Sequence, residues 1–299
     1  MITSSKGNKK PEDHKTTLTA KLFHNLCQVD PQGSAWHPPF YGGVSPLPFS
    51  GAVLKWIAIV TMLIDHIGAA IFLFYFRRYP KTPALGTLYD ILRDVGRVAF
   101  PIFVFLLVEG FLHSKNSLKY LLRLAVFALV SEIPFDLAFH DKLFYWEKQN
   151  VFFTLFLGLA AVQGMSNLEK TVWKLCTAPE GEKPDMSPAV GRIYLAFSNA
   201  GLVLLAFVLA ELMNTDYHGL GVLAICIMYF FRHKPLVGAG LCSLVLLASS
   251  LRELYSLAAL IPISLYNGKR GRQAKYFFYA FYPVHLLILY LLRRYLILP

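Results

Sequence analysis

Apolar runs separated by short polar connections make up most of the chain after residue 50. Each run is long enough, or nearly so, to cross about 30 Å of hydrocarbon as a helix. The first 50 residues are polar and lack the apolar core of a secretory signal. We therefore predict a polar cytoplasmic tail over residues 1–50 and one all-α, polytopic membrane bundle over residues 51–299. About nine transmembrane helices are expected, over residues 53–76, 95–112, 117–138, 150–166, 192–213, 217–231, 235–250, 252–266 and 275–297.

The basic residues between the runs predict the orientation of the chain. Cytoplasmic loops carry an excess of Lys and Arg, and an odd number of spans places the two termini on opposite sides. With the N-terminus in the cytoplasm, the first outer connection is the main exception to this rule, because it holds Arg77, Arg78, Lys81 and Arg93. The stretch 167–191 has mixed charge and three prolines, so we expect a solvated loop there. The predicted location is the inner (cytoplasmic) membrane.

Composition supports a membrane protein and excludes several other classes. The chain is 56% hydrophobic and only 16% charged, where a soluble domain holds about a quarter charged residues. The net charge of +11 sits largely in clusters between apolar runs, so no nucleic-acid partner is expected. Four cysteines without CxxC spacing indicate neither a disulfide framework nor a metal site, and no metal is expected.

The first run, "LKWIAIVTMLIDHIGAAIFLFYF", carries Asp65 and His66 near its middle. An ionisable group at that depth costs about 2.5–3.5 kcal/mol and faces a polar cavity or a partner. Lys55 and His66 are eleven positions apart, which places them within about 20° of one helix face and about 16 Å apart along the axis. Asp65 lies about 100° around the helix, so we expect a partner for it from another span. A structural histidine in the bundle interior is the alternative for His66.

The last run repeats this layout, with His285 ten residues, or about 15 Å, deeper than Lys275. Both helices are predicted to run in the same direction, which places His66 and His285 at similar depth in a polar chamber near the midplane. A packing or headgroup-level histidine is the alternative for His285. The rings of "KYFFYAFYPVH" either line a channel or fill helix contacts.

Further charges lie within the second and third runs. Arg97 is expected toward the outer leaflet and Glu109 toward the inner one, and the third run holds Arg123, Glu132 and Asp136. Such charges must pair or face water, so they imply a polar interior, with a structural ion-pair network as the alternative. Capping is the ordinary explanation for the polar residues that open the fourth and sixth spans, Gln149, Asn150 and Thr154, and Asp216, Tyr217 and His218.

A buried histidine suits one chemistry in particular. Imidazole is the usual general base for an amine or hydroxyl that attacks an acyl carbonyl, and no GxSxG elbow is present, which favours direct transfer. A polyanionic donor such as a nucleotide thioester needs cations at the cytoplasmic mouth, although the positive-inside bias alone also supplies them. The available cations are Lys55, Lys115, Lys119, Arg123, Lys269, Arg270, Arg272 and Lys275.

Five segments in order resemble the TraX family, named for the conjugative F-pilin acetylase, over about residues 53–293. They are "LKWIAIVTMLIDHIG", "GRVAFPIFVFLLVEGF", "YLLRLAVFALVSEIPFDLAF", "QNVFFTLFLG" and "KYFFYAFYPVHLLILY". That family is similar to membrane-bound acyltransferase family 3, whose hallmark is Arg or Lys, ten residues, then His. Lys55 and His66 satisfy this pattern. The resemblance implies acetyl-CoA as donor, His66 as the catalytic histidine and an acyl relay from the cytoplasm outward.

The resemblance also carries residues over to the site. It gives His66, Asp65, Arg97 and Glu109 as catalytic candidates, through the DHIG, GR and EGF motifs. With the cations at the mouth, the donor-binding candidates are Lys55, Lys119, Arg123, Lys275 and His285. The acceptor, a peptide amine such as a pilin N-terminus or an envelope glycan hydroxyl, stays open, as does the oligomeric state. A secondary transporter or exporter with a buried His, Asp and Arg path is the alternative, and a noncatalytic assembly factor is a third possibility.

Overall fold

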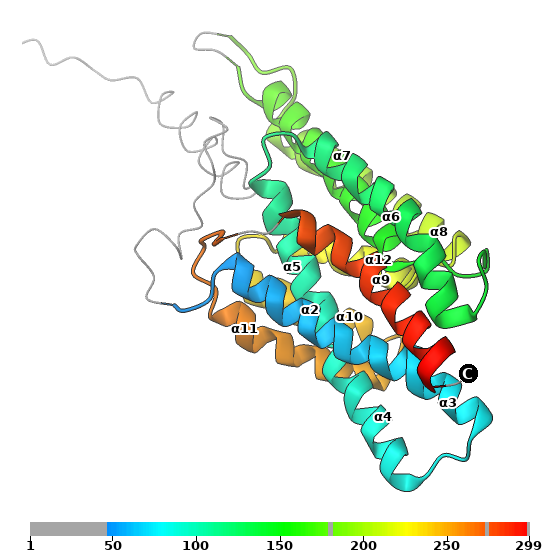
Figure 1. The fold of residues 1–299 in the computed structure, drawn as a ribbon. Helices are drawn as coiled ribbons and strands as arrows, with labels where there is room; N and C mark the ends of the chain where they lie inside the picture. The colour runs from blue at the N-terminus through cyan, green and yellow to red at the C-terminus, as the bar shows by residue number, and fades with distance from the viewer. Residues whose placement is uncertain (1–46, 179–181, 273–274, 298–299) are drawn as a thin grey trace, which may run out of the picture. The chain divides into compact units, whose positions relative to one another are not determined.

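The structure, a computed structural model, describes residues 47–178, 182–272 and 275–297, so nearly all of the predicted tail lies outside the described residues. The described chain forms helices and no strand, with isolated bridges between Phe49 and Tyr266 and between Gln149 and Thr215 (Figure 1). The predicted all-α membrane bundle is thereby confirmed. The elements are α2 (Gly51–Ile67), the π-helix η1 (Gly68–Phe72), α3 (Leu73–Arg78), α4 (Pro83–Gly96), α5 (Ala99–Leu112), α6 (Ser117–His140), α7 (Val151–Cys176), α8 (Pro188–Leu212), α9 (His218–Phe230), α10 (Pro235–Leu246), the 3₁₀-helix η2 (Leu251–Ala259), α11 (Leu260–Ser264), α12 (Lys275–Leu292) and the π-helix η3 (Arg293–Ile297).

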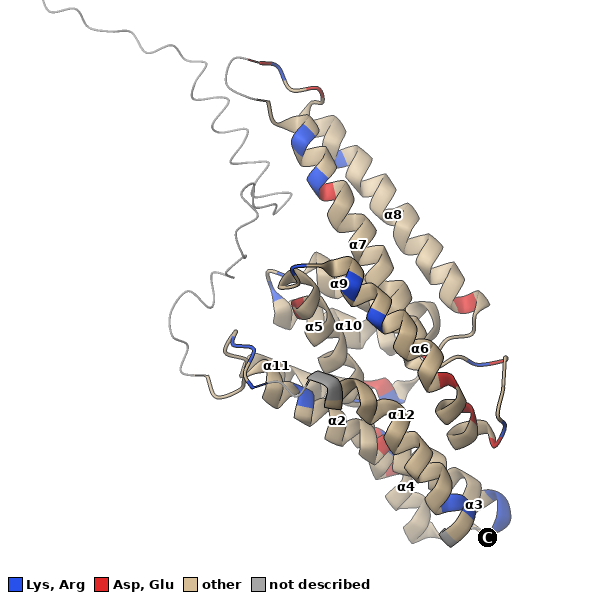
Figure 2. Cartoon of the chain, turned by 45° about the horizontal axis from the view of Figure 1, so that its top comes forward, with Lys and Arg blue, Asp and Glu red and all other residues tan. Residues whose placement is uncertain are grey.

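Four of the described helical stretches are long and apolar enough to cross a membrane: Gly51–Arg78, Pro83–Leu112, Val151–Cys176 and Pro188–Leu212. Two shorter apolar helices, His218–Phe230 and Pro235–Leu246, accompany them. Most of the helical length in Figure 2 carries neither acidic nor basic residues, as hydrocarbon requires. The chain is therefore a membrane protein.

Three predicted boundaries need correction. The first outer connection is largely helix: Thr82 caps the N-terminus of α4 by accepting from the Leu85 N–H, and Pro83 takes the first helical position. The predicted loop over 167–191 is shorter, because α7 continues to Cys176 and α8 begins at Pro188. The predicted span 252–266 is a nine-residue 3₁₀-helix followed by a five-residue α-helix, not one membrane helix.

The chain divides into two compact units, and each is described by itself. In the unit that contains residues 164–201, the end of α7 and the start of α8 enclose a small apolar core. Val172, Cys176 and Leu195 are its buried residues, with Leu168, Trp173 and Met186 packed against them. No residue predicted for the site lies in this unit.

The other unit, residues 37–163 and 202–299, contains every predicted site residue. Helix α5, "AFPIFVFLLVEGFL", is apolar around nearly its whole circumference and buries nine residues, which makes it a central helix. Helix α2 packs against α4 and α5, and α12 packs against α6 and α2. These contacts bring the first and last spans, with their two histidines, into one core.

Candidate functional site

His66 and His285 meet in the core of the larger unit. Nδ1 of His66 lies 2.7 Å from Nε2 of His285, and the two rings are parallel within 2°. The edges of Phe139 and Tyr282 pack against His66, and His285 is only 5% exposed. The sequence placed both histidines at similar depth, and the structure brings them into direct contact.

The hydrogen bonds define which nitrogen of each ring carries a proton. Nδ1 of His285 lies 2.7 Å from the Phe281 carbonyl oxygen, which only accepts, so this nitrogen is the donor. In a neutral ring Nε2 of His285 is then the acceptor, and Nδ1–H of His66 donates to it. The remaining nitrogen, Nε2 of His66, carries a lone pair and makes no hydrogen bond within the described part of the chain. The pair thus holds His66 with a basic nitrogen available.

Asp65 does not contact His66 but pairs with two arginines. Its Oδ2 lies 2.8 Å from Nη1 of Arg93, and its Oδ1 lies 2.8 Å from Nη2 of Arg97. The predicted partner from another span is confirmed, and both carboxylate oxygens are used by it. Asp65 therefore joins α2 to the α4–α5 segment, and its predicted catalytic role stays a prediction.

Arg97 is the centre of this ion-pair cluster. Its Nη1 lies 2.8 Å from Oε1 of Glu253, whose side chain is only 3% exposed. Two carboxylates and two arginines thus balance in charge, which is how buried ions are tolerated. The structure thus places Arg97 in an ion-pair cluster, and its predicted catalytic role stays a prediction. Sequence reasoning missed Glu253, because a nine-residue 3₁₀-helix gives no recognisable pattern, and it missed Arg93 by placing it in a connection.

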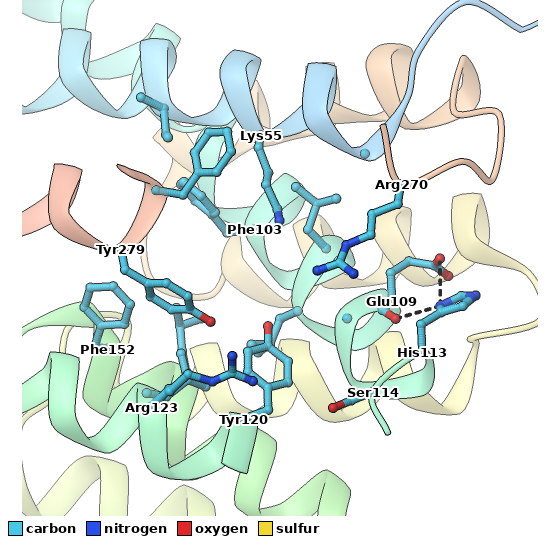
Figure 3. Close-up of a pocket in the computed structure, with 18 of the residues that line it drawn as sticks. Lys55, Phe103, Glu109, His113, Ser114, Tyr120, Arg123, Phe152, Arg270 and Tyr279 are labelled. Atoms are coloured by element: carbon cyan, nitrogen blue, oxygen red, sulfur yellow. Dashed lines mark hydrogen bonds and ion pairs between the residues drawn. The ribbon is translucent and has the colours of Figure 1, made fainter. Parts of the chain in front are cut away.

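A pocket of about 500 Å³ lies at the N-terminal end of α2 (Figure 3). Lys55 points into it from α2, Arg123 from α6 and Arg270 from the segment that precedes α12. Tyr120 and Tyr279 add hydroxyl groups. The lining reaches the exposed Lys115 at the surface. The cavity therefore combines a cationic mouth with an apolar interior, lined by Ile59, Phe103, Leu106, Leu107, Leu124, Phe152 and Leu155.

The predicted site residues lie in three places: at the histidine pair, in the ion-pair cluster and at the pocket. Glu109 lines the pocket near its mouth, where its carboxylate lies 3.7 Å from Nδ1 of His113 and accepts from the Tyr266 hydroxyl at 3.4 Å. It is therefore placed with the donor candidates rather than with His66. His285 was predicted to bind the donor, but it contacts His66 and does not line the pocket. Lys119 lies one residue before the lining residue Tyr120, and the side chain of Lys275 lies outside the described residues.

The polar residues that open α7 and α9 behave differently from each other. Oδ1 of Asn150 accepts from the Phe152 N–H at 3.0 Å, a local cap, while its amide donates to the Glu132 carboxylate. Thr154 instead contacts Thr215 and the Asp216 carbonyl oxygen. Tyr217 precedes α9 in a left-handed conformation, φ 64°, and its side chain caps nothing. Capping therefore accounts for Asn150 and not for Tyr217.

Comparison with known proteins adds to this geometry. The family model described as TraX protein matches residues 50–293. The probable fimbrial assembly protein FimC, serogroup H1, of Dichelobacter nodosus is 31% identical over 264 residues, which cover 81% of this chain and 95% of that protein. No solved structure matches the chain. Among the described residues, no group of three or more His, Cys, Asp or Glu side chains could hold a metal ion.

Proposed function

The chain belongs to the TraX family, and on that premise we propose that it is an integral membrane acetyltransferase of the inner membrane. It moves the acetyl group of acetyl-CoA to an amine or hydroxyl of an acceptor in the membrane or cell envelope. The observation that carries this proposal is the free Nε2 of His66, held in its basic tautomer by His285 and the Phe281 carbonyl. A positioned imidazole of this kind contributes about 10²–10⁴-fold to a proton-transfer step.

In this mechanism Nε2 of His66 takes the proton of the acceptor as its nitrogen or oxygen attacks the thioester carbonyl. The new bond to the acetyl carbon forms, the carbon–sulfur bond breaks, and the CoA thiolate leaves. The proton on Nε2 makes His66 cationic, and its Nδ1–H stays hydrogen-bonded to His285, which orients the ring throughout. The ion pairs of Asp65 and Arg97 hold α2 in the register that this contact needs.

The pocket at the N-terminal end of α2 is the proposed donor site. Phosphate groups are bound best by Arg and Lys, and Lys55, Arg123 and Arg270 point into the cavity. Lys119 and Lys275 belong to the ends of α6 and α12 that border the pocket. Their role in donor binding stays a prediction. This assignment places the mouth, and with it the N-terminal side of α2, in the cytoplasm, where acetyl-CoA is available. The spacing of Lys55 and His66, which matches the pattern of acyltransferase family 3, supports the same orientation.

The proposed acceptor is a peptide amine. The relative from Dichelobacter nodosus is named for fimbrial assembly, which favours the amine of a pilin-like peptide over a glycan hydroxyl. A transporter or exporter would bury similar residues, and it would not consume acetyl-CoA.

Equilibrium binding of labelled acetyl-CoA to the purified protein in detergent tests the donor assignment. Replacing Arg270 with Ala removes a charged hydrogen-bond donor worth about 1.5–3 kcal/mol, so the Kd should rise about tenfold or more. Arg252→Ala is the matched control, because Arg252 does not line the pocket. Its Nη2 lies 2.5 Å from Oδ1 of Asp90, and its Nη1 pairs with Asp94. No binding by the folded wild-type protein, or equal binding by the Arg270→Ala variant, would contradict the assignment.

A further inference from the structure

The deep end of the pocket stops short of the histidine pair. Ile59 lines the pocket and lies seven residues before His66 on nearly the same face of α2, so His66 is about 10 Å deeper along the axis. On α12 the lining residue Phe278 shares its face with Tyr282 and His285, four and seven residues further on. The two helices therefore continue the line of the pocket toward the histidines.

The ring of Tyr282 lies between the wall of the pocket and the two histidines. Its centroid lies 5.0 Å from that of Phe152, a lining residue of the pocket. The same ring lies 5.9 Å from His66 and 5.7 Å from His285, edge to face in each case. Tyr282 is only 4% exposed and does not itself line the pocket. One side chain thus touches both the wall of the donor site and the two rings of the proposed base.

Neighbouring rings confine Tyr282. Its ring contacts those of Phe152, His66 and His285, and a closely packed interior leaves little room for such a side chain to move. The ring is therefore part of the wall rather than an adaptable filler.

We propose that Tyr282, backed by Phe152, sets the length of the acyl group that the enzyme accepts. This inference rests on the proposed acetyltransferase function. The acyl end of the donor reaches the edge of the Tyr282 ring, where the acceptor is deprotonated by His66. An acetyl group fits at this boundary, whereas each further methylene meets the closely packed aromatic wall of Tyr282 and Phe152. Discrimination of about tenfold or more per methylene is within reach of such packing.

The test compares transfer from acetyl-, propionyl- and butyryl-CoA to native membrane material, measured as CoA thiol released and acyl label gained. In the Tyr282→Leu variant, kcat/KM for butyryl-CoA relative to acetyl-CoA should rise at least about tenfold. Phe152→Leu, on the pocket side of the same wall, should shift the ratio in the same direction and covers the case in which Tyr282→Leu does not fold. Tyr282→Phe keeps the ring and should keep the preference for acetyl.

The matched control is Phe277→Leu, which removes an aromatic ring from the same helix. Phe277 packs against Trp56 and Phe281, is 44% exposed and does not line the pocket, so the ratio should not change. If folded Tyr282→Leu and Phe152→Leu both keep the wild-type ratio, the role of this wall is refuted although transfer itself stands. If the wild-type protein transfers no acyl group from any of the thioesters, the proposed function fails first and this inference fails with it.

Discussion

Two neighbouring residues of α2, Asp65 and His66, have entirely different partners. The 100° between consecutive residues of a helix directs Asp65 toward the arginines of α4 and α5 and His66 toward α12. This divergence could be predicted from the sequence, as could the shared depth of His66 and His285. The identity of the contacts could not, because Arg93 and Glu253 reach the cluster only through tertiary packing.

Helical spacing predicted which cationic residues line the pocket, but it did not predict which other residues do so or what they contact. Lys55 and Arg123 follow from the face and the end of a span, and both line the cavity. Glu109 was expected toward the inner leaflet as a catalytic candidate, and a position on one helix does not specify that it lines the pocket rather than contacting His66. Tyr282 was one of several rings in an aromatic run, and no feature of that run distinguishes it from the rings that only pack.

His285 should act through His66 rather than touch the substrates. Replacing it with Phe keeps a ring of similar size and removes the acceptor for Nδ1–H of His66, so kcat should fall by part of the 10²–10⁴-fold that the base supplies. The Kd for acetyl-CoA should not change, because His285 does not line the pocket. Steady-state kinetics together with equilibrium binding measure both quantities.

The variant His285→Gln is the informative comparison, because a glutamine oxygen can accept the same hydrogen bond. It should recover part of the activity that His285→Phe loses. Equal loss in both variants would indicate that His285 only fills space.

At the scale of elements, the approach of α4 to α2 depends on Gly96, the last residue of α4. A Cβ built there would coincide with the side chain of Asp65, which is itself held by two ion pairs. Small residues permit such close approach between membrane helices. The sequence shows the glycine, but only the structure shows what it faces.

Gly96→Ala should therefore destabilise the protein, by about 1–3 kcal/mol, because the side chain of Asp65 cannot move without breaking its ion pairs. Gly240→Ala in α10 is the matched control, since nothing lies within 4 Å of its added Cβ, and it should be neutral or stabilise by up to about 1 kcal/mol. Thermal unfolding in detergent compares the two. Equal melting temperatures would show that α4 does not pack closely on α2.

At the scale of the whole molecule, the hydrophobic pattern predicted the fold class and located most of the helices. It failed where polar residues lie in helices, as in α4, and where an apolar stretch is not one helix, as in 251–264. In both places the charges are satisfied by partners distant in sequence, such as Arg252 by Asp90 and Asp94. Local hydropathy does not show that a charge is paired with a residue distant in sequence.

The central claim, that His66 is the base of an acetyl transfer, is tested most directly in inside-out membrane vesicles supplied with labelled acetyl-CoA. The initial rate of label incorporation into membrane material is compared between wild type, His66→Gln and His233→Gln, a histidine in the α9–α10 connection that does not line the pocket. The account predicts a loss of at least about 100-fold for His66→Gln, with protein level and acetyl-CoA binding unchanged, and a wild-type rate for His233→Gln. A wild-type rate in the His66→Gln vesicles would contradict it.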